Sequence, residues 1–93
     1  MPIPNLRHEI DSATQEVLET IQRALADSGG AATSFAFPGL PPLACRKVLS
    51  LQVLRRQKRN FMKLATNSLA RTRTNRDAIK RLFVEYLQQH GDE

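Results

Sequence analysis

The sequence predicts an all-α fold: three helices, the second of them longest, with a loop rich in proline, glycine and phenylalanine between the first two. Apolar residues recur at three- and four-residue steps in three segments, as on one face of a helix. No segment alternates apolar and polar residues as a half-buried strand does, so no strand is expected. The 93 residues fit one small domain, residues 1–93.

The first helix is expected at about residues 5–27. Pro4 suits the start of a helix, and Gly29 and Gly30 suit its end. Acidic residues occur early in the segment, where the positive end of the helix dipole stabilises negative charge. The predicted buried stripe consists of Leu6, Ile10, Ala13, Val17, Ile21, Ala24 and Leu25.

Residues 28–42 are expected to form the loop, because proline and glycine interrupt regular structure there. Phe35 and Phe37 make this loop more apolar than an ordinary linker. The favoured interpretation is that the two rings cover one end of the helical core. A hydrophobic docking segment for a partner is the alternative, and the Pro-x-x-Pro spacing of PGLPP is a minor third one, as a ligand for an SH3-like groove.

The second helix is expected at about residues 43–70. At 100° per residue, its apolar arc and its cationic arc lie opposite each other. Lys58 falls on the apolar side, where its long stem is expected to carry the charge outward. The apolar arc comprises Leu51, Val53, Leu54, Phe61, Met62, Leu64, Ala65 and Leu69.

The third helix is expected at about residues 75–90. Thr74 with Asp77 resembles a capping box, and Asn75 is an alternative cap. Gly91 suits the end of the helix. The predicted buried residues are Ala78, Ile79, Leu82, Phe83, Tyr86 and Leu87.

Charge is distributed unevenly along the chain. The whole chain carries a net charge of +5, whereas residues 46–81 carry +11 and the segments on either side carry −3 each. Such a one-sided segment attracts phosphates or acidic surfaces. The acidic first helix is also able to fold back and neutralise part of this charge, and the two interpretations are compatible.

The predicted function is therefore that of a nucleic-acid-associated binding protein without catalysis, in contact with the phosphate backbone of DNA or RNA. A helix-turn-helix register fails around Arg73, and no aromatic residue interrupts the cationic set to stack on bases, so weak sequence preference is expected. The candidate contact residues are Arg55, Arg56, Arg59 and Lys63 on the second helix, with Arg71, Arg73 and Arg76 at the joint to the third.

The alternative function is an assembly subunit or adaptor whose basic helix docks on an acidic protein surface, with Phe35 and Phe37 as a second contact. Self-association into a homo-oligomer is compatible with either function, because a chain of this size has a small core. A basic amphipathic helix that meets anionic lipid or a calmodulin-like groove is a third option, and it requires the second helix to leave the core.

Catalysis, a metal site and a cofactor are not expected. The single cysteine, Cys45, excludes an internal disulfide and a multi-cysteine zinc site, and no spacing pairs it with His8 or His90. "HEIDS" begins like a zinc-protease motif, but its fifth position is Ser12. No transmembrane segment is expected. The chain is predicted to be a soluble intracellular protein of unspecified compartment.

Overall fold

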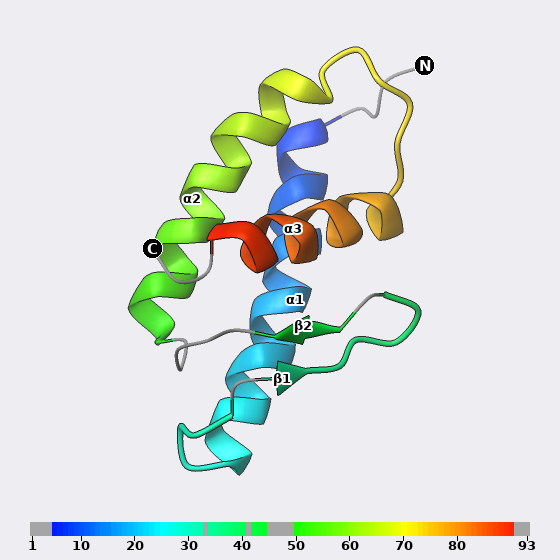
Figure 1. The fold of residues 1–93 in the computed structure, drawn as a ribbon. Coiled ribbons are helices and arrows are strands. Elements are labelled where there is room, and N and C mark those ends of the chain that lie inside the picture. Colours follow the sequence, from blue (N-terminus) through cyan, green and yellow to red (C-terminus); the bar gives the residue numbers. More distant parts are fainter. Residues whose placement is uncertain (1–4, 33, 41, 45–49, 91–93) are drawn as a thin grey trace.

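The computed structural model describes residues 5–32, 34–40, 42–44 and 50–90. It confirms the predicted fold class. Three helices, α1 (Leu6–Asp27), α2 (Leu51–Ser68) and α3 (Arg76–His90), pack together with a small hairpin of β1 (Ser34–Phe35) and β2 (Leu43–Ala44). In Figure 1, α1 runs the length of the molecule, α2 lies beside its first half, and α3 crosses the pair above the hairpin.

The first helix has the predicted boundaries, and its end follows from the glycines. Gly30 donates its backbone N–H to the carbonyl of Leu25 at 2.7 Å, and Gly29 donates to Ala26 at 3.2 Å. These two bonds form a Schellman motif, which satisfies carbonyls that have no partner inside the helix. Gly29 and Gly30 have φ values of 66° and 87°, a conformation that disfavours residues with a Cβ atom.

The hairpin corrects the prediction that the chain has no strand. Ser34 and Phe35 pair antiparallel with Ala44 and Leu43 respectively. Between the strands, the N–H of Leu40 donates to the carbonyl of Phe37 at 3.1 Å, and the intervening Gly39 has φ of 72°, as a type II turn with Pro-Gly at its centre requires. Strands of two residues are too short to produce an alternating pattern, so periodicity did not reveal them.

The second helix is shorter than predicted, and α1 is the longest helix, with 22 residues against 18. The predicted start at residue 43 is wrong, because Leu43 and Ala44 pair with β1. The helix begins instead after Ser50, whose side-chain oxygen accepts the N–H of Val53 at 3.2 Å. That bond is an N-cap, which satisfies one of the free donors of the first turn.

The third helix has the predicted extent to within one residue. Asn75 is its cap, since its Oδ1 accepts the N–H of Ala78 at 2.9 Å. The side-chain amide of Gln88 then joins this helix to the hairpin. Its nitrogen donates to the carbonyl of Ala44 at 2.8 Å, and its oxygen accepts the N–H of Ala44 at 3.1 Å. The free edge of β2 is thereby paired by a side chain.

The core lies where α1, α2, α3 and the hairpin meet. The rings of Phe61 and Phe83 approach to 5.0 Å between centroids, and the ring of Tyr86 lies 5.5 Å from that of Phe61. Phe35 and Phe37 are also buried, at 2% and 7% exposed. The buried residues of the helices are mainly Ile10, Val17, Leu18 and Ile21 of α1, Leu54, Phe61 and Ala65 of α2, and Ile79, Phe83, Val84 and Leu87 of α3.

Several residues of the predicted apolar arcs lie outside this core. Leu51, Leu64 and Leu82 are 40%, 55% and 39% exposed. Conversely, Gln57 is 2% exposed, and its side-chain nitrogen donates to the carbonyl of His90 at 2.8 Å, which joins α2 to the end of α3. The face of α2 that packs against the other elements is therefore narrower than its apolar arc.

Because the ring of Phe35 is buried in the core, Phe35→Ala should lower the free energy of unfolding by about 3 to 5 kcal/mol. Leu51→Ala, at an exposed position, should change it by about 0.5 kcal/mol or less. Urea denaturation followed by circular dichroism measures both, and Phe35→Leu gives a milder variant if the alanine variant does not fold. Equal stability of the Phe35 and Leu51 variants would contradict the core assignment.

Candidate interaction surface

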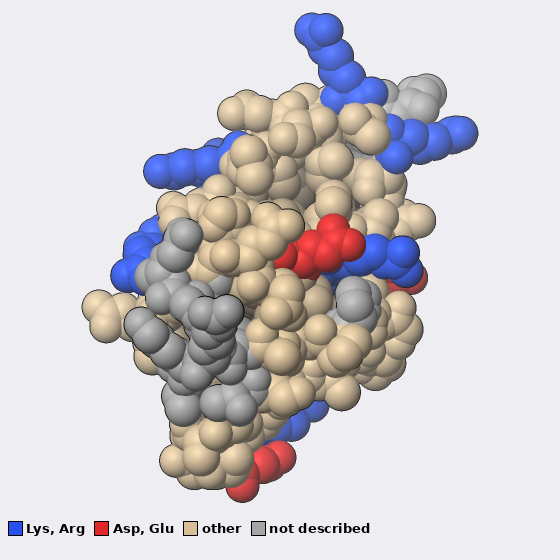
Figure 2. Space-filling view, viewed as in Figure 1, with Lys and Arg blue, Asp and Glu red and all other residues tan. Residues whose placement is uncertain are grey.

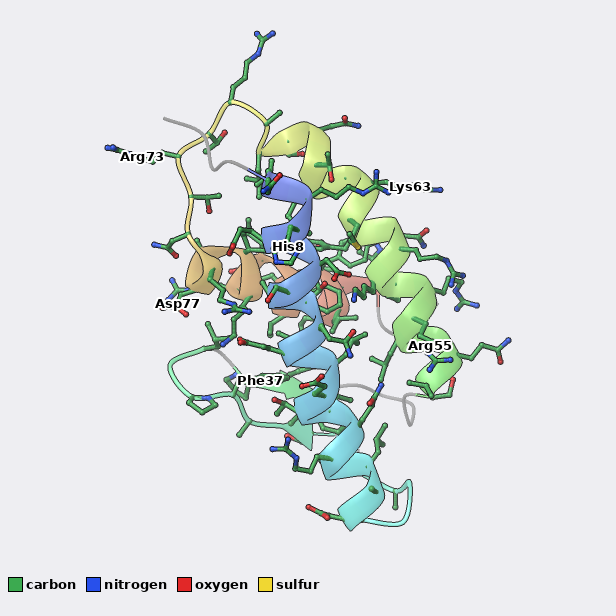
Figure 3. The ribbon with its side chains drawn as sticks, turned by 180° about the vertical axis from the view of Figure 1, so that it is seen from behind. His8, Phe37, Arg55, Lys63, Arg73 and Asp77 are labelled. Carbon is green, nitrogen blue, oxygen red and sulfur yellow. The ribbon has the colours of Figure 1, made fainter. Side chains whose placement is uncertain are left out.

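Six of the seven predicted cationic contact residues form one exposed region, named here the cationic surface. Arg55, Arg56, Arg59 and Lys63 lie on α2, and Arg71 and Arg73 lie in the turn between α2 and α3. Figure 3 shows Arg55 and Lys63 pointing away from the body of the molecule, and Arg73 extending from the turn. In Figure 2, Lys and Arg side chains project along α2 and around this turn.

Arg76, the seventh predicted residue, is directed toward α1. Its guanidinium contacts Glu16 at 3.2 Å and donates a hydrogen bond to the Oγ of Ser12. Lys80 binds the other carboxylate oxygen of Glu16 at 3.1 Å. One carboxylate of α1 thus holds two cations at the start of α3, and the structure separates Arg76 from the cationic surface.

Lys58 corrects a second expectation. Its amine does not extend outward to solvent but binds Asp11 of α1 at 2.9 Å, and it also donates to the side-chain oxygen of Gln15 at 2.9 Å. The Lys58 side chain is only 15% exposed. The acidic first helix therefore neutralises part of the basic segment, as one interpretation of the charge pattern suggested.

No such ion pair is found for Arg55, Arg59, Lys63, Arg71 or Arg73 among the described residues. Like charges on one helix face repel each other, so the grouping of these cations does not stabilise the fold. Their positive potential is directed to solvent, where it attracts an anionic partner.

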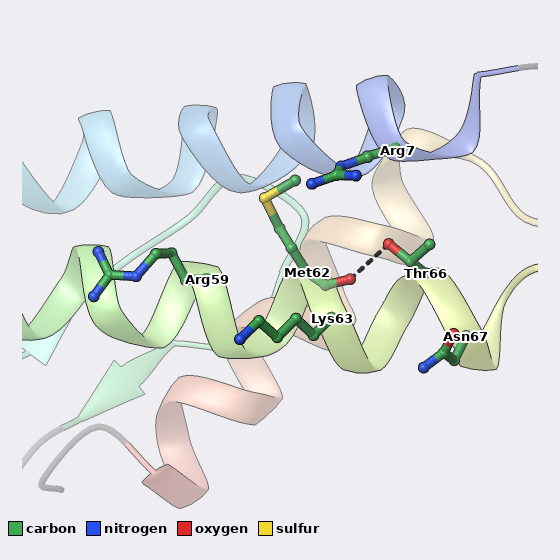
Figure 4. A pocket seen from close by; sticks show the side chains of 6 residues that line it. All are labelled: Arg7, Arg59, Met62, Lys63, Thr66 and Asn67. Atoms are coloured by element: carbon green, nitrogen blue, oxygen red, sulfur yellow. Dashed lines mark hydrogen bonds between the residues drawn. The ribbon is translucent and has the colours of Figure 1, made fainter.

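A groove of about 400 Å³ lies between the start of α1 and the second half of α2. Figure 4 shows Arg7 above it, on α1, and Lys63 on the opposite side, on α2. Met62 lies between the two helices, and the hydroxyl of Thr66 donates to the Met62 carbonyl at 2.6 Å. No acidic residue lines this groove, which is formed by Arg7, Arg59, Met62, Lys63, Thr66 and Asn67.

Arg7 was absent from the predicted set, because the charge pattern assigned α1 as an acidic helix. Its proximity to α2 follows from packing of the two helices in three dimensions, which the sequence spacing does not reveal. The sequence contained one weak indication that the start of α1 lies near α2, because both Leu6 and Met62 were predicted to be buried. In the structure both residues are partly buried and pack against the same core.

Phe35 and Phe37, the predicted docking residues, lie in the core instead of on the surface. Phe37 lines a shallow groove together with Glu16, Val17 and Thr20 of α1. The burial of both rings agrees with the favoured interpretation that they cover the core. Neither ring is exposed in this structure to act as a docking contact.

Metal-binding side chains are not gathered in the part of the chain that the structure describes. Within residues 5–32, 34–40, 42–44 and 50–90, no three His, Cys, Asp or Glu side chains are close enough to hold a metal ion together. Cys45 lies outside these residues. Among the described helices, none is long and apolar enough to cross a membrane.

Comparison with known families decides the assignment. The family described as chromatin-associated protein KTI12 matches residues 2–88, nearly the whole chain. The chain belongs to the KTI12 family. A relative described as a KTI12 homologue, from Arabidopsis thaliana, is 38% identical over 90 residues, which are 91% of this chain and 29% of the relative. The chain thus spans less than a third of this relative. No solved structure matches the chain.

Membership in the KTI12 family corrects the predicted function. The sequence predicted a non-enzymatic protein that binds the nucleic-acid backbone, with an acidic-partner adaptor as its alternative. The KTI12 family is described by its association with chromatin, and the chain spans only part of a longer relative. A charge pattern identifies an electrostatic surface, but it does not identify the protein of which that surface is a part.

The ion pairs of Glu16 should make a small, salt-sensitive contribution to stability. Because the Glu16 side chain is 42% exposed, Glu16→Gln should lower the free energy of unfolding by about 0.2 to 1 kcal/mol at low ionic strength. In roughly 1 M salt the Debye length falls to about 3 Å, and most of the difference should vanish.

Glu19→Gln is the matched control, since it removes the same charge from an exposed position on α1 that forms no ion pair among the described residues. Urea denaturation at two salt concentrations measures both variants. If the Glu19 and Glu16 variants lost equal stability, the effect would belong to net charge and not to the contacts of Glu16.

Proposed function

We propose that this chain is a helical module of a longer KTI12-family protein, and that its cationic surface serves the chromatin association by which the family is described. The proposal places the protein in the nucleus. It differs from the predicted function because the module binds to assembled chromatin and not to the backbone of free DNA or RNA.

The observation that carries the proposal is the selective neutralisation of charge. Carboxylates of α1 bind Lys58, Arg76 and Lys80. On the outer face of α2, Arg55, Arg59 and Lys63 form no ion pair with α1 among the described residues. These three cations recur at four-residue steps on this helix, and its opposite face is packed in the core. Their relative positions are therefore preorganised before any partner binds, which lowers the entropic cost of binding.

We propose further that this module contributes binding and not catalysis to the longer protein. The relative from Arabidopsis thaliana has more than two thirds of its length outside the matched segment. Any catalytic group of a KTI12-family protein of that length is expected in those other residues.

The experiment compares two variants with the same change of charge in the full-length gene product. Arg55→Glu with Arg59→Glu reverses two charges on the cationic surface. Arg23→Glu with Arg81→Glu reverses two exposed charges elsewhere, on α1 and α3. Retention in the chromatin fraction of lysed nuclei is measured over a series of salt concentrations, and circular dichroism checks that helicity is unchanged.

We expect the α2 variant to lose chromatin association by about tenfold, and the control variant to retain it, because electrostatic attraction depends on where the charge lies. Equal losses in both variants would assign the effect to net charge. Unchanged association in the α2 variant would refute a role for the cationic surface.

A further inference from the structure

Two leucines that periodicity assigned to the core lie exposed on the same groove. Leu64 of α2 is 55% exposed, and Leu82 of α3 is 39% exposed. The groove between them has a volume of about 210 Å³, and Phe61, Ala65, Leu69 and Tyr86 form most of its remaining wall. Its apolar floor is continuous with the core, because Phe61 and Tyr86 belong to the aromatic cluster.

The chemistry of this groove differs from that of the cationic surface. Its polar residues are Ser68, Glu85 and Gln89, and no Lys or Arg lines it. In contrast, the groove beside α1 is lined by three cations. Among the described residues, the exposed Leu64 and Leu82 thus lie on a groove without cations, whereas the exposed Leu51 lies on a groove with Arg55 and Arg59. The two surfaces suit two different partners.

An amphipathic helix fits the α2–α3 groove. Clustered exposed leucines with a polar rim are typical of interaction sites, and a helix commonly places apolar residues from one of its faces into such a groove. Glu85 and Gln89 lie at the rim of the groove. The carboxylate of Glu85 can bind a cation of the docked helix, and the amide of Gln89 can form a hydrogen bond with a polar residue beside its apolar face.

The size of the groove favours an occupant that is tethered to it. A stable interface between separate proteins buries about 1,200 to 2,000 Å². The accessible apolar part of this groove, which consists of Leu64, Leu82 and Tyr86, is small for a second copy of the chain. A covalently linked segment binds at an effective concentration in the millimolar range, so a smaller contact suffices. The relative from Arabidopsis thaliana provides such a segment, because more than two thirds of its length lies outside the match.

We infer that the α2–α3 groove is the docking site for an amphipathic helix from the part of the KTI12-family protein that lies outside these 93 residues. Leu64 and Leu82 are its apolar contacts, and Glu85 marks its polar edge. This docking fixes the module to the longer protein on one side and leaves the cationic surface accessible on another. The inference does not depend on chromatin association.

The test measures thermal unfolding of Leu64→Ser with Leu82→Ser in two forms, the full-length gene product and the 93-residue chain. Leu51→Ser is the matched control, since Leu51 is as exposed as Leu82 but lies at the other end of α2, on a groove with Arg55 and Arg59. Amide hydrogen exchange is followed in both forms of the wild-type protein over residues 61–69 and 82–89.

In the full-length protein, amide exchange over these two segments should be about tenfold slower than in the 93-residue chain. The double serine variant should cancel this protection and lower the unfolding temperature of the full-length protein by several degrees. It should change the 93-residue chain little, and Leu51→Ser should change neither form.

Three outcomes would overturn the inference. A mature gene product of 10.5 kDa would leave no further segment to dock. Equal exchange rates in the two forms would show that the groove is not covered. Concentration-dependent dimers of the 93-residue chain that the double serine variant abolishes would identify a second copy as the occupant.

Discussion

The packing of one face of α1 is the constraint on which the rest of the structure depends. Ile10, Ala13, Val17 and Ile21 are almost completely buried, and both α2 and α3 pack against this helix. Most of the stability of a helix in a protein comes from packing of its apolar face, so α2 and α3 require this common surface. The burial of apolar area against α1 thus holds α2 and α3 in place, and α3 in turn holds the hairpin through Gln88.

The same helix also determines which positive charges remain exposed. Asp11 and Glu16 project from the side of α1 that meets Lys58, Arg76 and Lys80. These exposed or partly exposed ion pairs add little to stability. Their larger effect is on the electrostatic surface, because they remove the cations nearest to α1 and leave those on the outer side of α2. Helix packing thus converts a segment that is basic throughout into a module with a cationic face.

The helices were predictable from the sequence, because an apolar period of 3.6 residues persists through each of them. Details that depend on three-dimensional packing were not. Leu64 and Leu82 fell on apolar arcs that are wider than the faces in contact, and Leu43 was assigned to a helix because a two-residue strand leaves no period. Of the candidate surface, the cations of α2 could be predicted, whereas Arg7 and the redirection of Arg76 could not, since both depend on α1 lying alongside.

The pairing of Gln88 with the backbone of Ala44 has a consequence for dynamics. A hairpin of four paired residues is expected to open independently of a helical bundle, because local stability varies within a protein. Here the amide of a residue in the last turns of α3 replaces a third strand at the edge of β2. Opening of the hairpin must break these two bonds, so it is coupled to fraying of the end of α3. Segments 44 residues apart in sequence thus form one cooperative unit of local unfolding.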